Sequence, residues 1–167
     1  MFEIGDAIVH PIRGAGIITD IEKRRREGER QSYYTIDLLA KPHTQLMLPV
    51  SAVDDLGIRS VVSARRLCKV WQILESDHET LPKNYRQRHK VITEQLHSGD
   101  IFKIAEVLRD LTWRRKKRGN LSTQDLRSYQ EALDLLSAEV AAIEGKDWEG
   151  VKHQIWEVLE EPPAVPS

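Results

Sequence analysis

Few residues in this sequence combine the types and the spacing that catalysis requires. The six histidines are scattered, and none stands in an HExxH motif or another metal-ligand spacing, so the sequence predicts no metal site. Gly14 and Gly16 form a bare GxG motif, which we interpret as a β-turn with a positive φ rather than a phosphate-binding turn. The adjacent carboxylates Asp54 and Asp55 are typical of a solvated loop. No nucleophile–base pair is recognisable, and the sequence predicts a protein that is not an enzyme, with no catalytic residue and no cofactor.

Basic residues form two clusters that favour a polyanionic ligand. The first surrounds Tyr85 in a stretch without acidic residues, and the second is the run 114–118. Beyond residue 125 acidic residues dominate, so a net charge of only −1 hides a basic and an acidic side. Phosphate contacts need lysine and arginine collected on one side of a protein. The alternative for the second run is that it only stabilises the end of a helix through the helix dipole.

Tyr85 has two interpretations. On a helix it shares a face with His89, Ile92 and Leu96, and this spacing alone favours a core residue in the first turn. The alternative is an exposed aromatic residue at a helix N-terminus, flanked by basic residues. Such a side chain could act as a wedge at an unstacked base step in a minor groove.

The elements that must position these residues follow two different patterns. Up to about residue 50, short apolar and β-branched runs between turns predict strands at residues 7–10, 16–21, 32–38 and 44–50, with a charged hairpin tip at 23–30. Such strands indicate a small, strongly bent sheet or partial barrel. After about residue 60 the pattern becomes helical, and the predicted fold class is α+β.

Five helices are predicted in the second half, packed as a compact bundle. Ser63, Asp100 and Ser122 have the residue types of helix N-caps, and Gly119 is expected to end the third helix. We therefore expect a β domain at residues 1–59, a helical domain at 60–162 and a tail at 163–167.

The single cysteine, Cys68, excludes an intramolecular disulfide framework and a cysteine-cluster zinc site, and we expect it to pack in or near the core. No apolar run approaches the length of a membrane span, and the first residues lack the pattern of a signal peptide. These features are typical of a cytoplasmic protein.

Eight short segments of the sequence form an ordered set of motifs. They are FEIGDAIVHP at 2–11, GAG at 14–16, YY at 33–34, MLPV at 47–50, LGIR at 56–59, NYRQRHK at 84–90, SGD at 98–100 and IAEVLRDL at 104–111. These segments resemble the CarD/CdnL family of bacterial transcription regulators. They occur in the family's order, and the resemblance spans about residues 2–143.

This resemblance implies a Tudor-like RNA-polymerase-interacting domain, shared with transcription-repair coupling factors, followed by a helical DNA-binding domain. The first would bind the polymerase β subunit through a strand edge and basic contacts. The second would contact promoter DNA near the −10 element in the minor groove and stabilise the open complex, with sigma factor in the same assembly. The protein would then associate with the nucleoid through the polymerase, without a membrane or a small-molecule substrate.

The resemblance also implies site residues. The expected polymerase contacts are Arg24, Arg25, Met47 and Pro49. The expected DNA contacts are Asn84, Tyr85, Arg86, Arg88, Lys90, Arg114, Arg115 and Lys117.

Three positions depart from the family pattern. Tyr85 stands where most relatives have the wedge tryptophan, Gln87 replaces one arginine of a pair, and Leu126 replaces a basic residue. Two other functions remain open at this point. One is autonomous, non-specific DNA binding, with Asn84 and Gln87 as candidates for reading bases; the other is a protein-interaction adaptor without DNA contact.

Overall fold

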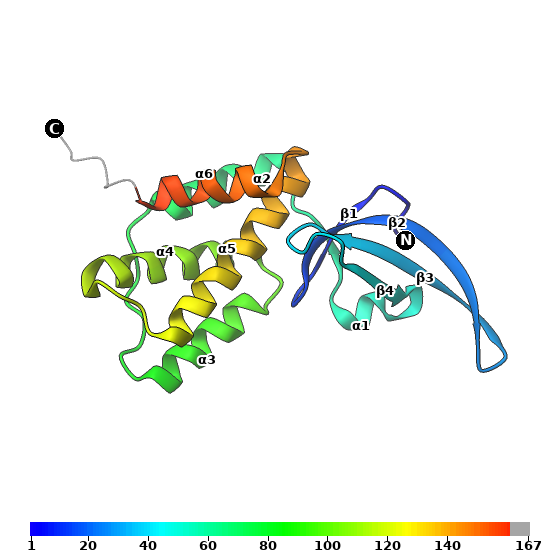
Figure 1. Ribbon diagram of the computed structural model, residues 1–167, viewed down its shortest axis with the longest axis horizontal. Coiled ribbons are helices and arrows are strands. Elements are labelled where there is room, and N and C mark those ends of the chain that lie inside the picture. The colour runs from blue at the N-terminus through cyan, green and yellow to red at the C-terminus, as the bar shows by residue number, and fades with distance from the viewer. Residues whose placement is uncertain (161–167) are drawn as a thin grey trace.

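The computed structural model describes residues 1–160 and contains a five-stranded sheet followed by a helical bundle (Figure 1). Every neighbouring pair of strands is antiparallel, in the order β4-β3-β2-β1-β5. The strands are β1 (Ala7–His10), β2 (Gly14–Arg26), β3 (Glu29–Leu38), β4 (Gln45–Pro49) and β5 (Arg59–Ser60). This arrangement confirms the predicted α+β fold class. The two final residues of the predicted helical domain, 161–162, and the tail at 163–167 lie outside the described residues.

The inner face of the sheet holds a small apolar core. Ile8, Ile18 and Ile36 are fully or almost fully buried in it. Gly16 in β2 lies so close to β3 that a Cβ there would stand 2.5 Å from the Ile36 side chain. Only glycine fits this position, which explains the second glycine of the GxG motif, while Gly14 has the expected positive φ of 90°.

The charged hairpin is longer than predicted. β2 and β3 stay paired through the charged residues as far as the pair Arg26 and Glu29, so residues 23–30 are not a loop. Only Glu27 and Gly28 form the turn, and both have positive φ, as in a two-residue type I′ turn. The hairpin therefore projects beyond the rest of the sheet as a two-stranded arm (Figure 1).

A short segment with a 3-10 turn, η1 (Val50–Ala52), and one helical turn, α1 (Val53–Leu56), connects β4 to β5. Asp54 and Asp55 therefore lie in a helical turn, where the sequence suggested a loop. We call β1 to β5 with α1 the β module.

Five helices form the helical part, as predicted. They are α2 (Ala64–Glu75), α3 (Tyr85–Leu96), α4 (Ile101–Arg118), α5 (Thr123–Glu144) and α6 (Trp148–Glu160). The side chains of Ser63, Asp100 and Ser122 accept hydrogen bonds from the first turns of α2, α4 and α5, which confirms the three predicted N-caps. Gly119 is the C-cap of α4, also as predicted.

The core of the helical part lies between α4 and α5, with α2 and α6 on one side and α3 on the other (Figure 1). Leu108, Leu111 and Leu136 are fully buried in it. The prediction for Cys68 was wrong, because this residue of α2 is exposed: the buried stripe of α2 runs through Leu67, Val70 and Leu74.

Candidate nucleic-acid interface

The N-terminus of α3 presents Tyr85 to solvent. Asn84 is the N-cap, and its Oδ1 accepts hydrogen bonds from the backbone N–H groups of Arg86 (3.0 Å) and Gln87 (3.2 Å). Tyr85 is the first helical residue and is 58% exposed, so its interpretation as a core residue was wrong. Arg86 lies beside the ring, with its Nε donating to the Tyr85 hydroxyl at 3.3 Å. An aromatic side chain and a cation thus stand together at a capped helix end.

Arg88 does not lie on this surface. It is 5% exposed, and its Nε contacts both carboxylate oxygens of Asp125, at 3.0 and 3.2 Å. Its Nη1 donates to the backbone carbonyls of Pro82 (3.1 Å) and Lys83 (2.9 Å), directly before α3. The expectation that Arg88 contacts DNA was wrong, because these acceptors take up its guanidinium inside the protein.

The buried face of α3 explains this difference. Ile92 and Leu96 are buried as expected, but the third buried residue of the helix is Arg88, four positions before Ile92, and not Tyr85. From Ile92 the face continues equally well to His89, as the expected face did, or to Arg88, since three and four residues both approximate one turn. The sequence has no local signal for the choice, because the carboxylate that compensates Arg88 belongs to α5.

Asp125 joins α3, α4 and α5 at this end of the bundle. Its backbone N–H donates to the Ser122 hydroxyl (3.1 Å), whereas its carboxylate, 5% exposed, pairs with Arg88 and lies 3.4 Å from the Arg114 Nε. Burial and the nearby charges of Arg88 and Arg118 lower the pKa of Arg114, and Asp125 partly offsets this. The role of Asp125 as the counter-ion of two arginines was not found from the sequence.

The run at the end of α4 divides into buried and exposed charges. The side chain of Arg114 is 14% exposed, and Arg115 forms an ion pair with Glu160 and lies over the Tyr129 ring. Lys116 donates to the carbonyl of Leu159 at 2.6 Å. Lys117 is exposed and lies 4.8 Å from the centre of the Trp113 ring. Several of these cations therefore bind groups of α5 and α6, while the charge of Lys117 is exposed to solvent.

Further exposed residues lie on α3 and in the first turn of α5. Lys90 projects to solvent from α3, and Leu126 is 43% exposed in the first turn of α5, next to the buried Asp125. The exposed Arg127 follows it. An apolar residue at a surface position and a neighbouring cation thus stand where the family pattern has one basic residue.

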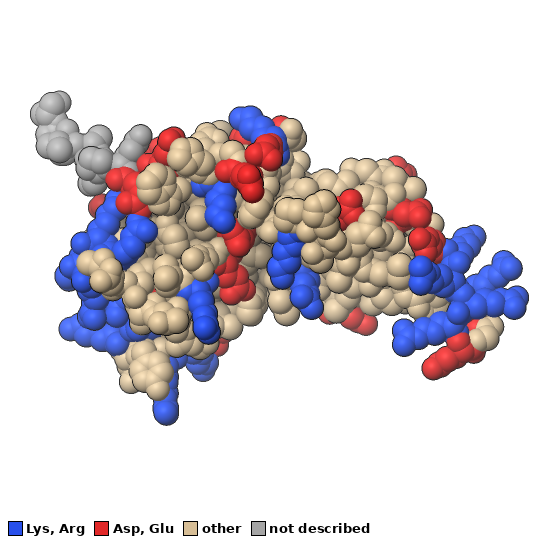
Figure 2. Space-filling view, viewed as in Figure 1, with Lys and Arg blue, Asp and Glu red and all other residues tan. Residues whose placement is uncertain are grey.

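Lys and Arg gather at two ends of the molecule (Figure 2). One end is the helical part at its far side from the sheet, and the other is the tip of the β2–β3 hairpin. Most acidic residues on the face shown lie away from these two basic ends, so the small net charge hides an uneven distribution of charge.

The expected polymerase contacts lie on the β module. Within residues 1–160, β4 is an edge strand that pairs only with β3, and Met47 on it is 39% exposed while Leu48 is buried. Pro49 lies opposite Tyr33, which also pairs with Glu22 on β2. Arg24 and Arg25 follow two and three residues further toward the hairpin tip and are both exposed. Arg24 forms an ion pair with Glu22 at 3.0 Å.

No cluster of metal-ligating side chains occurs within residues 1–160. In the same residues, none of the helices combines the length and the apolar character needed to cross a membrane.

An α+β chain with an open strand edge in one part and an exposed aromatic residue among cations in the other has the features of a protein that binds macromolecules. The chain belongs to the CarD family. Residues 69–156 match the CarD C-terminal domain, and residues 2–62 match the CarD-like/TRCF RID domain. A Bacillus subtilis (strain 168) protein named "Putative transcription factor YdeB" is 34% identical over 145 residues, which cover 87% of this chain and 94% of that protein. The resemblance found in the sequence is thus confirmed, and the chain is a transcription regulator of this family rather than an enzyme.

Proposed function

We propose that this protein binds the RNA polymerase β subunit with its β module and the upstream edge of the promoter bubble with the N-terminus of α3. In this way it prolongs the lifetime of the open complex. The observation that carries the proposal is the exposed Tyr85 ring with Arg86 beside it. The buried Arg88 binds the backbone directly before α3 and so holds this helix end in place.

The chemistry of this helix end suits a forked minor groove. An aromatic ring stacks on any exposed base, and such contacts are worth about 1–3 kcal/mol each. The Tyr85 hydroxyl adds a donor that a tryptophan ring lacks at that position, and Arg86, Lys90 and Lys117 supply cations for phosphates. A wedge of this kind favours the unstacked state and slows the collapse of the bubble.

The β4 edge suits the proposed polymerase contact. Its unpaired backbone groups can accept another strand, and alternate side chains then determine specificity. Met47 provides an apolar contact on this edge, while Arg24 and Arg25 on the adjacent arm favour an acidic surface on the β subunit.

The first test is the half-life of open promoter complexes formed by the cognate polymerase. We expect the wild-type protein to lengthen it and Tyr85→Ala to shorten it again by about tenfold, which corresponds to the loss of one stacking contact. Trp156→Ala is the matched control, because Trp156 is also an exposed aromatic residue (42%) but lies on α6.

Equal effects of the two variants would refute the wedge. Binding to a forked promoter fragment without polymerase separates the remaining functions: no binding at all would support a protein adaptor, and tight binding with full activity would support an autonomous DNA-binding protein. We expect weak, salt-sensitive binding that polymerase strengthens.

A further inference from the structure

We propose that Arg59 and Glu139 are positioning residues, which fix the angle between the β module and the helical part so that both proposed contacts form in one complex. The inference rests on the function proposed above. It assigns a functional role to the junction between the β module and the helical part, in addition to the proposed contacts with the polymerase and with DNA.

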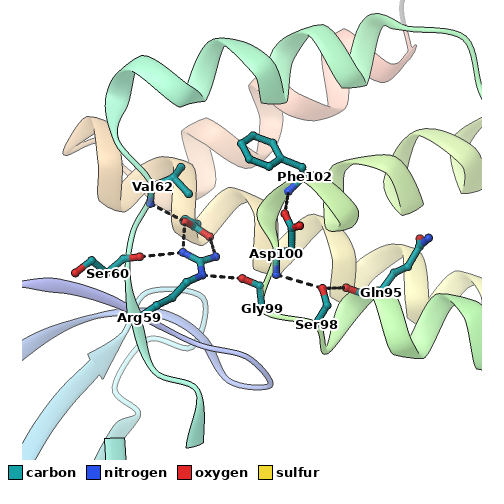
Figure 3. Close-up of polar contacts among 9 residues, drawn as sticks. Arg59, Ser60, Val62, Gln95, Ser98, Gly99, Asp100 and Phe102 are labelled. Atoms are coloured by element: carbon teal, nitrogen blue, oxygen red, sulfur yellow. Dashed lines mark hydrogen bonds and ion pairs between the residues drawn. The ribbon is translucent and has the colours of Figure 1, made fainter. Parts of the chain in front are cut away.

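Arg59 in β5 connects three parts of the chain. Its Nε donates to the carbonyl of Gly99 (2.6 Å), in the turn between α3 and α4, and its Nη1 donates to its own strand at the carbonyl of Ser60 (3.0 Å). Its Nη1 and Nη2 also form a bidentate pair with the Glu139 carboxylate in α5, at 2.8 and 2.7 Å. Figure 3 shows the Arg59 side chain between the sheet and the Gly99 turn.

Both carboxylate oxygens of Glu139 accept hydrogen bonds at this junction. Its side chain is 2% exposed, and besides Arg59 its Oε2 accepts from the backbone N–H of Val62, between β5 and α2 (3.1 Å). The carboxylate therefore holds both a side chain of the β module and the segment that leads into the helical part. Bidentate arginine–carboxylate pairs require coplanar groups, so this contact depends strongly on orientation.

Apolar packing surrounds the pair but does not define an angle in the same way. Val9 and Ala15 of the sheet pack against Ala138 of α5 in a small buried cluster. A Cβ on Gly14 would lie 3.1 Å from the Leu135 side chain, so the two parts are in close contact there. Apolar burial is non-directional, and a small cluster tolerates a range of tilts at similar buried area. The hydrogen bonds between Arg59 and Glu139 are directional, and they select one tilt of the β module relative to the helical part.

A fixed angle matters because the two proposed contacts lie on different parts of the molecule (Figure 1). Docking of the first contact raises the effective concentration of the second only if the geometry lets both form together. A loose junction would keep each contact and lose the cooperation between them.

The test uses the full chain with the double substitution Arg59→Met/Glu139→Leu. Apolar groups of similar size often replace a buried ion pair without loss of stability, whereas the backbone N–H of Val62 loses its acceptor, so we expect the Tm to fall by only about 3 °C. Binding to a β-subunit fragment and to forked DNA, each measured alone, should stay unchanged. The effect on open-complex lifetime should be largely lost. Val70→Ala, in the core of α2 away from the junction, is the control for a general loss of stability.

A distance measurement reports the angle directly. The exposed Cys68 is the single cysteine, so one added cysteine at the exposed Lys41 of the β module gives a pair of spin labels across the junction. We expect a narrow distance distribution in wild type and a broad one in the double variant. Glu139→Gln, which keeps the shape of the side chain, should be intermediate and covers the case in which the double variant fails to fold.

The proposal is overturned if the variants keep a narrow distribution, or if a broad distribution leaves the lifetime effect intact. If the wild-type protein itself does not change the lifetime, the proposed function fails. The distance distributions need no polymerase and still decide whether the pair fixes the angle.

Discussion

Arg88 and Tyr85 lie three positions apart on α3 and have opposite environments. The buried Arg88 connects Asp125 of α5 to the carbonyls of Pro82 and Lys83, whereas Tyr85 faces solvent. The chain that leads into α3 is thereby tied to α5, so the exposed ring projects from a firmly held helix end. Arg88 supports the proposed DNA contact from inside the protein without touching DNA.

Arg88→Met should therefore lower the free energy of unfolding by about 3 kcal/mol, because it leaves a buried carboxylate with a single, longer ion pair. Denaturation by urea measures this loss. Arg86→Met is the matched control on the exposed face and should change stability by less than about 0.5 kcal/mol. Equal stabilities of the two variants would contradict the buried position of Arg88.

The hydrogen bonds of His10 depend on the protonation state of its imidazole ring. Its Nδ1 accepts the backbone N–H groups of Ile12 and Arg13, both at 3.1 Å, and only an unprotonated Nδ1 can do so. Burial, and then the charge of Arg13, lower the pKa of His10 below its ordinary value. The turn between β1 and β2 thus depends on a neutral imidazole.

Because the pKa of His10 is lower in the folded protein than in the unfolded chain, the unfolded chain binds the proton first as the pH falls. The free energy of unfolding should therefore decrease as the pH falls below about 6.5, the ordinary value of histidine. His10→Asn keeps an acceptor for the turn and should remove this part of the pH dependence in urea titrations. An unchanged pH profile in His10→Asn would show that other groups cause it.

At the scale of elements, the β2–β3 hairpin determines where the basic residues of the β module stand. Because β2 and β3 pair as far as Arg26 and Glu29, the charged hairpin tip expected at 23–30 is a two-stranded arm with a defined direction. Arg24 on this arm lies near the end of β4, so charge and strand edge belong to one proposed surface.

Arg24→Glu should weaken binding to a β-subunit fragment by about tenfold, because a basic group at the rim of an interface acts through complementary charge. DNA binding should not change. Lys41→Glu, an equal charge change at an exposed position outside this surface, is the control. Equal binding of the wild type and Arg24→Glu would exclude Arg24 from the contact.

At the scale of the whole molecule, the change from strand to helix periodicity correctly predicted the α+β order and the five helices, and cap residue types predicted the N-caps of three of them. These features are encoded locally, in side-chain alternation and in cap residues such as Ser63 and Asp100. The proposed surfaces were only partly predictable. The residues of α3 were found, but the burial of Arg88 depends on Asp125, 37 positions away in sequence.

The junction was not predictable for the same reason. Arg59 was noticed in the sequence only as part of a family segment. The carboxylate that binds it belongs to Glu139, 80 positions further on in the sequence. A charged run such as residues 23–30 is typical of a loop, and its pairing as two strands becomes visible only in the register of the sheet, where Arg26 lies opposite Glu29 but Arg25 lies opposite Arg30.

The two-residue turn at Glu27 and Gly28 has a consequence for the reach of the protein. Two residues added to each strand next to the turn would lengthen the arm by roughly 7 Å and keep every side chain on its face, since strands rise about 3.4 Å per residue and alternate with a period of two. The arm can therefore change in length, and in the distance it spans, without any change in the core of the sheet or in the junction.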